Sequence, residues 1–235
     1  MTGEAFITAI AALYGASDDD DLCAPLLLAL PVTGAAVSTL TDPFGAETIC
    51  ASDETAARLD ELQIDLGEGP CWEALRTGRP VLEPDVEGTA SERWPVALMA
   101  MHETRPGAVF AFPMLVGALR VGSVSLYNRG AGPLADATVE DATMLTAVVA
   151  RHVLQRALHR AERGGDGADW HGSHYSRREV LQASGVMAAQ TGVGADEALL
   201  LLRAYAFASG RTVRALAIDV LAGTIDFTDR RDTAL

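Results

Sequence analysis

Cys71 is a residue of this chain that could do chemistry, because of the residues around it. It follows Gly69 and Pro70, and proline is favoured in the first turn of a helix, so the thiol is expected to lie at a helix N-terminus. The helix dipole lowers the pKa of a thiol in that place, which would suit redox sensing. The alternative is a buried cysteine with a structural role only.

Two further candidates are weaker. His102 could ligate haem, although a single histidine on a helix is more often a surface residue. Asp65, Glu68 and Glu73 could bind a cation or a ligand amine, or could form a solvated acidic loop. The sequence has no nucleophile–base pair, phosphate-binding loop or metal-ligand spacing. It therefore predicts no catalytic site, no metal site and no identifiable cofactor.

The three cysteines, Cys23, Cys50 and Cys71, are widely spaced and form no C-x-x-C pair. An odd number of cysteines argues against a disulfide framework in a protein of the cytoplasm. We expect three reduced and mostly buried thiols.

Length and composition indicate a protein of one or two domains with a sizeable core. The chain has 235 residues, of which 49% are hydrophobic. The longest apolar run, 24–32, is far shorter than the roughly 20 residues of a membrane span, and prolines interrupt it. The N-terminus has no basic region typical of a signal peptide. These features predict a cytoplasmic protein without a membrane segment.

The net charge of −14 is unevenly distributed along the chain. Residues 171–235 contain seven arginines and seven acidic residues, so the whole excess of negative charge lies before them. An acidic body repels nucleic acid at long range, which argues against RNA contact by the N-terminal part. The absence of a basic excess in the C-terminal part also weighs against RNA binding there, because phosphate contacts normally dominate affinity.

The first 162 residues predict an α+β domain, in which helices flank an antiparallel sheet. Its strands alternate apolar and polar residues and come in two hairpins, with turns at 42–45 and at Gly117. An acidic cap at 17–21 and Ser52 are expected to begin helices. The expected helices are 1–16, 20–30, one after Ser52, one from Pro70, 95–104 and 136–162, and the expected strands are 36–40, 48–51, 81–82, 108–114 and 121–127.

The long helix 136–162 carries Leu145, Val148, Val149 and Val153 on one side. This face could join a second copy in a homodimer, which is the interpretation we favour, or pack on the sheet of its own chain.

Residues 163–175 are rich in glycine and predict a linker, and residues 176–228 predict a bundle of three short helices. Ser176 and Glu179 have the spacing of a capping box, and Thr212 can cap the third helix. In the second helix the predicted buried face is Ala198, Leu201, Leu202 and Tyr205.

The tail resembles the ANTAR domain, the RNA-binding output module of bacterial transcription antitermination regulators. The resemblance rests on the spacing of five short motifs over about 50 residues: 182–187, 195–198, Leu202-Arg203-x-x-Ala206, 210–212 and Val213-x-x-Leu216-Ala217. It implies binding to paired stem-loops in nascent mRNA.

Carried over by motif, the RNA-binding positions are Ala183, Gly185, Arg203, Ala206, Arg211 and Thr212. Small residues would let an RNA loop approach the helix, and the arginines would contact phosphates or stack on an unpaired base. Ser184 stands where many members of the family have a lysine, which removes one phosphate contact.

The preceding part resembles a GAF domain over roughly 10–158. The resemblance rests on the order of four strings: 66–74 (LGEGPCWEA), 93–95 (RWP), 112–115 (FPML) and 121–127 (VGSVSLY). GAF domains bind cyclic nucleotides, haem, tetrapyrroles or other small ligands, or nothing. The resemblance adds thioether attachment of a bilin to the roles open to Cys71.

Together these features predict a non-enzymatic, cytoplasmic antitermination regulator of the actinobacterial type, with a sensor domain at 1–162, a linker at 163–175 and an RNA-binding bundle at 176–228. We expect a homodimer with RNA stem-loops and a small-molecule ligand as partners. The alternative is a small-molecule or redox sensor whose bundle contacts proteins instead of RNA.

Overall fold

The fold was analysed in a computed structural model, which describes all residues except 1, 18–19, 42, 91, 163–176 and 229–235. The chain divides into two compact units, Met1–Tyr175 and Ser176–Leu235, and each is treated by itself. The linker predicted at 163–175 lies outside the described residues. None of the described helices combines the length and hydrophobicity that crossing a membrane requires.

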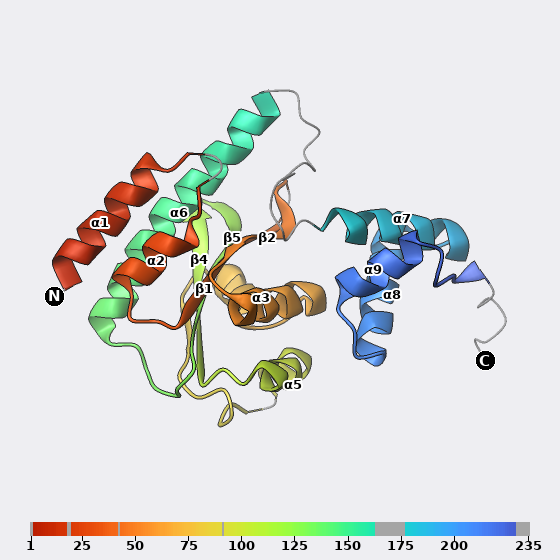
Figure 1. The fold of residues 1–235 in the computed structure, drawn as a ribbon, viewed down its shortest axis with the longest axis horizontal. Coiled ribbons are helices and arrows are strands. Elements are labelled where there is room, and N and C mark those ends of the chain that lie inside the picture. The colour runs from red at the N-terminus through yellow and green to blue at the C-terminus, as the bar shows by residue number, and fades with distance from the viewer. Residues whose placement is uncertain (1, 18–19, 42, 91, 163–176, 229–235) are drawn as a thin grey trace. The chain divides into compact units, whose positions relative to one another are not determined.

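The first unit is built on a five-stranded antiparallel sheet of order β2-β1-β5-β4-β3 (Figure 1). The two expected hairpins are present and pair through β1 and β5 at the centre. The α+β architecture with an antiparallel sheet is therefore confirmed. The strands are β1 (Gly34–Thr41), β2 (Gly45–Ala51), β3 (Val81–Glu83), β4 (Ala108–Val116) and β5 (Leu119–Asn128).

Alternation along the strands supplies two separate cores, one on each face of the sheet. In β4, Phe110 and Phe112 are fully buried on one face, whereas Val109 and Ala111 are buried on the other. Successive side chains of a strand point to opposite faces, so a sheet covered on both sides needs apolar residues at nearly every position.

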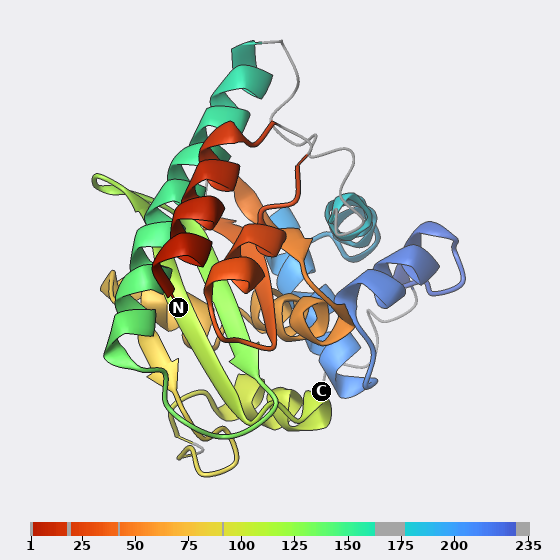
Figure 2. The same ribbon diagram turned by 60° about the vertical axis from the view of Figure 1, so that its left-hand side comes forward.

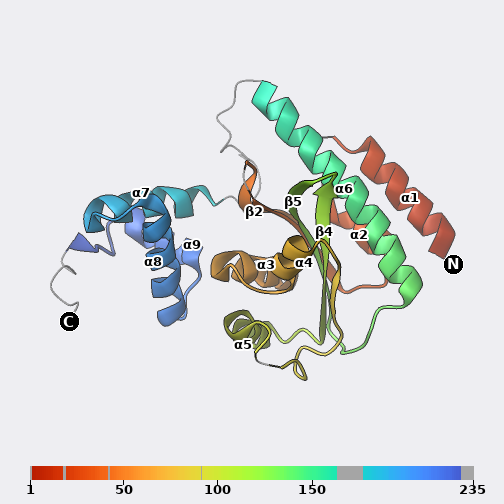
Figure 3. The ribbon, with the colours of Figure 1, turned by 180° about the vertical axis from the view of Figure 1, so that it is seen from behind.

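Helices cover both faces of the sheet, as the two opposite views of Figures 1 and 3 show. Helices α1 (Thr2–Gly15), α2 (Cys23–Ala29) and α6 (Asp136–Glu162) pack on the first face, and Figure 2 brings them forward. The other face carries α3 (Glu54–Leu66), α4 (Pro70–Thr77) and α5 (Pro95–Thr104). Pro70 and Pro95 occupy the first turn of their helices, where a missing N–H costs nothing.

The sequence predicted that Ser52 caps α3, but the N-cap in the structure is Asp53. The Asp53 carboxylate accepts a hydrogen bond from the Ala56 amide at 2.9 Å. The Ser52 hydroxyl instead accepts from the Ala35 amide of β1, also at 2.9 Å. Ser52 and Asp53 are both residue types that can cap a helix, but Ser52 already binds strand β1, so Asp53 caps α3.

The expectation of three reduced thiols was wrong for two of the cysteines. Cys23, the first residue of α2, and Cys50 in β2 form a disulfide, and their Cα atoms lie 6.1 Å apart. Cys71 alone is a free thiol, and it is buried. The two cysteines are 27 positions apart in the sequence and come together only in the fold, so no local spacing predicts the bond.

Helix α6 has the bounds that the sequence predicts, but its apolar side is already used within the chain. Leu145, Val149 and Val153 are fully buried in the core of the first face, and Val148 packs partly against it. These residues therefore line the core of their own domain, and a dimer remains a matter for proposal.

The second unit contains α7 (Arg178–Thr191), α8 (Ala195–Ala208) and α9 (Val213–Leu221) around one core. The N-cap of α7 is Arg177, without a side-chain cap, and the expected cap Ser176 lies outside the described residues. Thr212 caps α9, as predicted, by accepting from the Ala215 amide at 3.0 Å. The predicted buried face of α8 is shifted, because Leu201 is 40% exposed and Ala206 takes its place in the core.

Gly122 lies in β5 at a point of close approach between strands. A Cβ atom there would overlap the backbone carbonyl of Ser38 in β1. We expect Gly122→Ala to lower the free energy of unfolding of the sensor unit by about 1–3 kcal/mol, since neither strand can move away without breaking its ladder. Urea unfolding followed by the fluorescence of Trp72 and Trp94 measures this, in a background carrying Trp170→Phe.

Gly130→Ala is the matched control, because a Cβ at Gly130 meets no atom within 4 Å. It is expected to change the free energy by less than about 0.5 kcal/mol. Equal midpoints for the two variants would show that β1 and β5 have room for a side chain.

Candidate nucleic-acid interface and sensor site

The three-helix unit is held together by one core in which several side chains are small. Four of its eleven buried core residues are alanines, which allow the helices to approach closely. Outside the helices, Phe227 completes the core and meets Tyr205 edge-to-face, with 5.2 Å between ring centroids. The buried residues are Val180, Ala183, Met187, Ala198, Leu202, Ala206, Val213, Leu216, Ala217, Val220 and Phe227.

The six predicted RNA-binding positions fall into two groups in this unit. Ala183 and Ala206 are buried, with exposures of 0% and 1%, so their side chains pack between helices and do not face solvent. Gly185 is exposed on α7, and a Cβ there would meet no atom within 4 Å. Direct contact with RNA is therefore open to Gly185 and the more exposed polar residues, and the two alanines can act only through packing.

The connection between α8 and α9 is ordered by Arg211 and Thr212. The Arg211 amide donates to the Ala206 carbonyl at 2.9 Å, while Gly210 turns the chain with a positive φ of 65°. The Arg211 guanidinium pairs with Asp219 and donates to the Ala215 carbonyl at 3.2 Å. The backbone and side chain of Arg211 thus hold the end of α8 against the start of α9.

Two arginines of this unit, Arg211 and Arg214, are partly exposed and lie near carboxylates. Arg214 is 3.6 Å from Glu179, and the side-chain exposures in this pair and in Arg211–Asp219 lie between 33% and 38%. Ion pairs at this exposure contribute little to stability, about 0–1 kcal/mol. A phosphate could replace either carboxylate at small cost. Arg203 on α8 is half-buried.

In the sensor unit, the acidic residues Glu68 and Glu73 are bound within the protein. Glu68 accepts hydrogen bonds from the amides of Val96 and Ala97, at 2.9 and 3.1 Å, and so satisfies the N-terminus of α5. Asp65 is only 5% exposed. The solvated acidic loop that the sequence left open is therefore replaced by internal contacts, and binding of a cation or a ligand amine stays a prediction.

Glu73 joins α4 to the segment before α5. Its carboxylate accepts from Arg93 at 3.0 Å and from the Trp94 indole at 2.9 Å. Arg93 also bonds Glu83 of β3 at 3.0 Å and lies over the Trp94 ring, 4.4 Å from its centroid. The two strings of the sequence that contain these residues thus form one structural network.

Cys71 lies at the start of α4 as predicted, but inside the protein. Its exposure is 0%, and its amide donates to the side chain of Gln63 at 3.0 Å. Burial, and to a lesser degree the charge of Asp60, raises the pKa of the Cys71 thiol well above its ordinary value. This outweighs the helix N-terminus and works against a thiolate, so the redox or ligand role of Cys71 stays a prediction.

The remaining candidate, His102, is exposed, and its Nε2 lies 3.3 Å from the Val86 carbonyl oxygen. A hollow between α3 and the sheet has room for about one water molecule. The Ser125 hydroxyl in its wall has no hydrogen-bond partner. A larger ligand would require the lining side chains to move, and they are Ala56, Leu59, Gln63, Val109, Ser125, Leu126 and Tyr127.

Sequence reasoning missed Gln63, which is buried and links α3 to α4. Its side-chain oxygen binds the Cys71 amide, and its carbonyl accepts from the Trp72 indole at 2.6 Å. A polar residue on the apolar side of a predicted helix was the available signal. It also missed the contact of Arg156 in α6 with the carbonyls of Ser17 and Asp20, for which the sequence offers no signal.

We expect Glu73→Gln to destabilise the sensor unit in a pH-dependent way. Hydrogen bonds from Arg93, then its charge and the Trp94 indole, lower the pKa of Glu73 below its ordinary value of 4.5. A lowered pKa in the folded state adds stability above pH 4.5 that is lost as pH falls through the folded-state pKa. The loss is expected to be about 1 kcal/mol at pH 7 and to shrink below about pH 4.

Urea unfolding at pH 7 and at low pH, followed by circular dichroism, tests this. Glu87→Gln is the matched control, because Glu87 is exposed. A deficit for Glu73→Gln that is constant across the pH range would mean that lost packing, and not the ion pair, explains it.

Solved structures similar in fold to this chain include GAF domains. The GAF domain of a phosphoenolpyruvate-protein phosphotransferase from Acinetobacter superposes with a TM-score of 0.50 at 10% identity, covering 69% of this chain and 95% of that one. The corresponding domain (ptsP) from Coxiella burnetii gives a TM-score of 0.50 at 13% identity, covering 68% and 95%. A comparison with curated proteins gave no significant match.

Family models account for both units. The model of the GAF domain matches residues 20–153, more than half of the chain, and the model of the ANTAR domain matches residues 172–221. The first match contains all five strands, and the second contains α7, α8 and α9. The chain therefore belongs to the GAF domain family and carries an ANTAR domain after its GAF domain.

Proposed function

We propose that this protein is a non-enzymatic, signal-responsive regulator of transcription antitermination that binds paired stem-loops in nascent mRNA. The observation that carries the proposal is that the ANTAR match coincides with a unit that has its own hydrophobic core. RNA-binding antitermination regulation is what an ANTAR domain implies, and a GAF domain beside it implies that a signal controls it.

The RNA contact is assigned to the exposed polar side of the bundle. Arg203, Arg211 and Thr212 are partly exposed, and Gly185 offers a place where an RNA loop can approach the backbone. Arginines suit unpaired loops because the guanidinium both binds phosphate and stacks on bases. Ala183 and Ala206 contribute by holding the helices close together.

The GAF domain is the proposed receptor for the signal, in a homodimer of the actinobacterial type that acts in the cytoplasm. Two bundles held together could bind two stem-loops, which raises avidity without any new contact. The hollow beside Ser125 is the proposed place for a small ligand, provided that the side chains of its wall move.

A second candidate function is protein binding by the bundle. The observation that favours it is a set of large apolar side chains that are exposed on the bundle. Exposed apolar patches of this kind mark sites of contact with other proteins. Their exposures range from 39% to 63%, in Leu181, Leu200, Leu201, Phe207, Ile218 and Leu221. This candidate predicts no affinity for RNA.

Binding of the full-length protein to a pool of leader transcripts from its own genome, across a salt series, tests the proposal. We expect enrichment of tandem stem-loops. Arg203→Glu should weaken their binding at least about tenfold and lower the slope of log affinity against log salt by about one, since a phosphate contact is lost. Arg203→Gln, which keeps much of the side chain, should have a smaller effect.

Arg120→Glu is the matched control, because it makes the same change of charge on an exposed residue of the sensor unit. It should leave RNA affinity within about twofold of the unsubstituted protein. Thermal unfolding of each variant checks that the bundle is intact. Equal RNA affinity for Arg203→Glu and the unsubstituted protein would remove Arg203 from the interface.

A further inference from the structure

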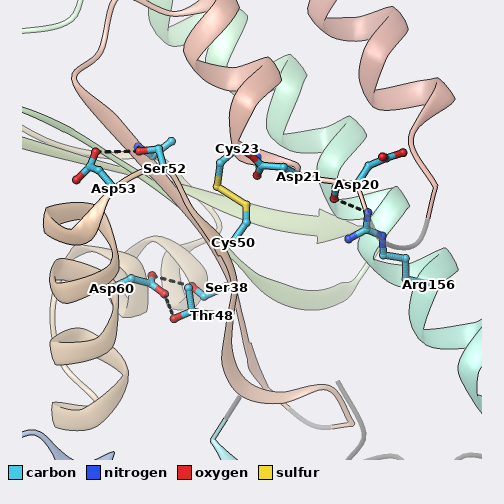
Figure 4. The surroundings of a disulfide bond; sticks show 11 residues. Asp20, Asp21, Cys23, Ser38, Thr48, Cys50, Ser52, Asp53, Asp60 and Arg156 are labelled. Carbon is cyan, nitrogen blue, oxygen red and sulfur yellow. Dashed lines mark hydrogen bonds between the residues drawn. A yellow bond between two sulfur atoms is a disulfide. The ribbon is translucent and has the colours of Figure 1, made fainter. Parts of the chain in front are cut away.

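The disulfide between Cys23 and Cys50 joins two elements that are otherwise separate. Cys23 begins α2, which covers one face of the sheet, and Cys50 lies in β2, the edge strand (Figure 4). The two sulfurs differ in access, because Cys23 is fully buried whereas Cys50 is half-buried. Cys50 is therefore the more accessible of the two cysteines to a thiol from solution.

The size of the hydrophobic cores argues against a purely structural role for this disulfide. Two extensive cores lie on the two faces of its sheet, whereas disulfides as structural supports belong to small domains that cannot build a sufficient core. If the protein acts on nascent RNA, as proposed above, it works where thiols are kept reduced. Disulfides found there are usually transient or redox-sensing.

The bridge is also connected to α6, the helix that precedes the ANTAR unit in the chain. The Asp21 carboxylate accepts from the Cys23 amide at 2.8 Å. One residue earlier, the Asp20 carbonyl accepts from Arg156 of α6 at 2.9 Å, and Figure 4 shows the guanidinium reaching it. Arg156 is only 4% exposed and also bonds the Ser17 carbonyl at 2.5 Å.

Asp20 strengthens this connection. Its carboxylate accepts from the Ser17 hydroxyl at 2.9 Å and from the Ser17 amide, which ties Asp20 to Ser17. Hydrogen bonds from Ser17, and to a lesser degree the charge of Arg156, lower the pKa of Asp20. Asp20 is thus fixed to α6 through Arg156 and, three residues later, the chain is fixed to β2 through the disulfide.

We propose that Cys23 and Cys50 form a reversible thiol–disulfide pair, whose redox state reaches α6 through Asp20, which Arg156 binds. The signal is an exchange with small thiols and disulfides of the glutathione type. This deepens the proposed function, because it names a signal for the GAF domain. Opening the bridge releases α2 from β2, and residues 20–23 with the Arg156 contact gain freedom.

The chemistry of the exchange balances in two steps. A thiolate attacks Sγ of Cys50, the protein S–S bond breaks, and the electron pair leaves on Sγ of Cys23, which takes up a proton. A second thiolate attacks the outer sulfur of the mixed disulfide and releases Cys50, which is protonated in turn. Two small thiols are oxidised to one disulfide, and the protein disulfide is reduced to two thiols. Oxidation of the protein is the reverse.

The experiment equilibrates the native full-length protein with mixtures of reduced and oxidised glutathione. Free thiols are then alkylated, and the Cys23 and Cys50 peptides are quantified by mass spectrometry. A chelator is present, because the possible ligand atoms of Asp21, Cys23 and Cys50 lie within 4.8 Å of one another and a metal could compete for the reduced pair. Hydrogen exchange of the peptides over 17–23 and 150–158 is measured on the same samples.

We expect the pair to change state with the glutathione ratio while the protein stays folded. Exchange in both peptides should be at least about fivefold faster in the reduced form. Cys50→Ser should give the fast exchange at every ratio, and Cys71→Ala should keep the full response. A bridge that resists excess reduced glutathione until the protein unfolds, or thiols that never pair, would overturn the proposal, as would unchanged exchange around Arg156.

The readouts separate this inference from the proposed function. Thiol labelling and hydrogen exchange need no RNA, so a redox response in a protein that binds no RNA in either state would refute the antitermination role and leave the thiol pair standing. Conversely, RNA binding by a protein whose thiols do not respond would refute the thiol pair alone.

Discussion

The sensor domain depends on one constraint, which is that its sheet is buried on both faces. The strands β1, β4 and β5 supply apolar side chains to both cores, and β4 does so residue by residue from Val109 to Phe112. The helices have to divide between the faces in equal layers, three on each. For this reason Leu145, Val149 and Val153 of α6 cover the sheet of their own domain.

The same constraint decides which polar groups can exist inside. Asp60 is fully buried and accepts from Ser38 and Thr48, at 3.0 and 2.6 Å, so two strand hydroxyls compensate a carboxylate that faces the sheet. Gln63, one turn later, uses both ends of its amide. Buried polar groups without partners cost about 1–3 kcal/mol, so these contacts are required once the sheet is covered.

Local patterns predicted the elements well and the contacts between them poorly. Pro70, Pro95 and Thr212 mark helix starts through the chemistry of single turns, and the structure has the helices where these residues place them. The competition between Ser52 and Asp53 was decided by strand pairing, which no local rule contains. The disulfide and the Arg156 contacts likewise arise from residues far apart in sequence.

The candidate RNA-binding unit was predictable as three helices, but not the side to which each residue belongs. The apolar residues of α8 are numerous enough that a helical period fits more than one buried face, and the predicted one was Ala198, Leu201, Leu202 and Tyr205. In the structure the buried face includes Ala198 and Ala206, whose small side chains allow close packing. Ala183 of α7 and Ala206, two positions of the ANTAR resemblance, are both buried in the core of the bundle.

The small side chains in that core have an energetic consequence. With four alanines among eleven buried residues, the bundle removes less apolar surface from water than a core built of leucines would, because each alanine contributes far less than a leucine. A ligand that binds only the folded form of such a unit raises its melting temperature by mass action. If the C-terminal unit binds RNA as proposed, its melting temperature would therefore report the fraction of the unit that is occupied.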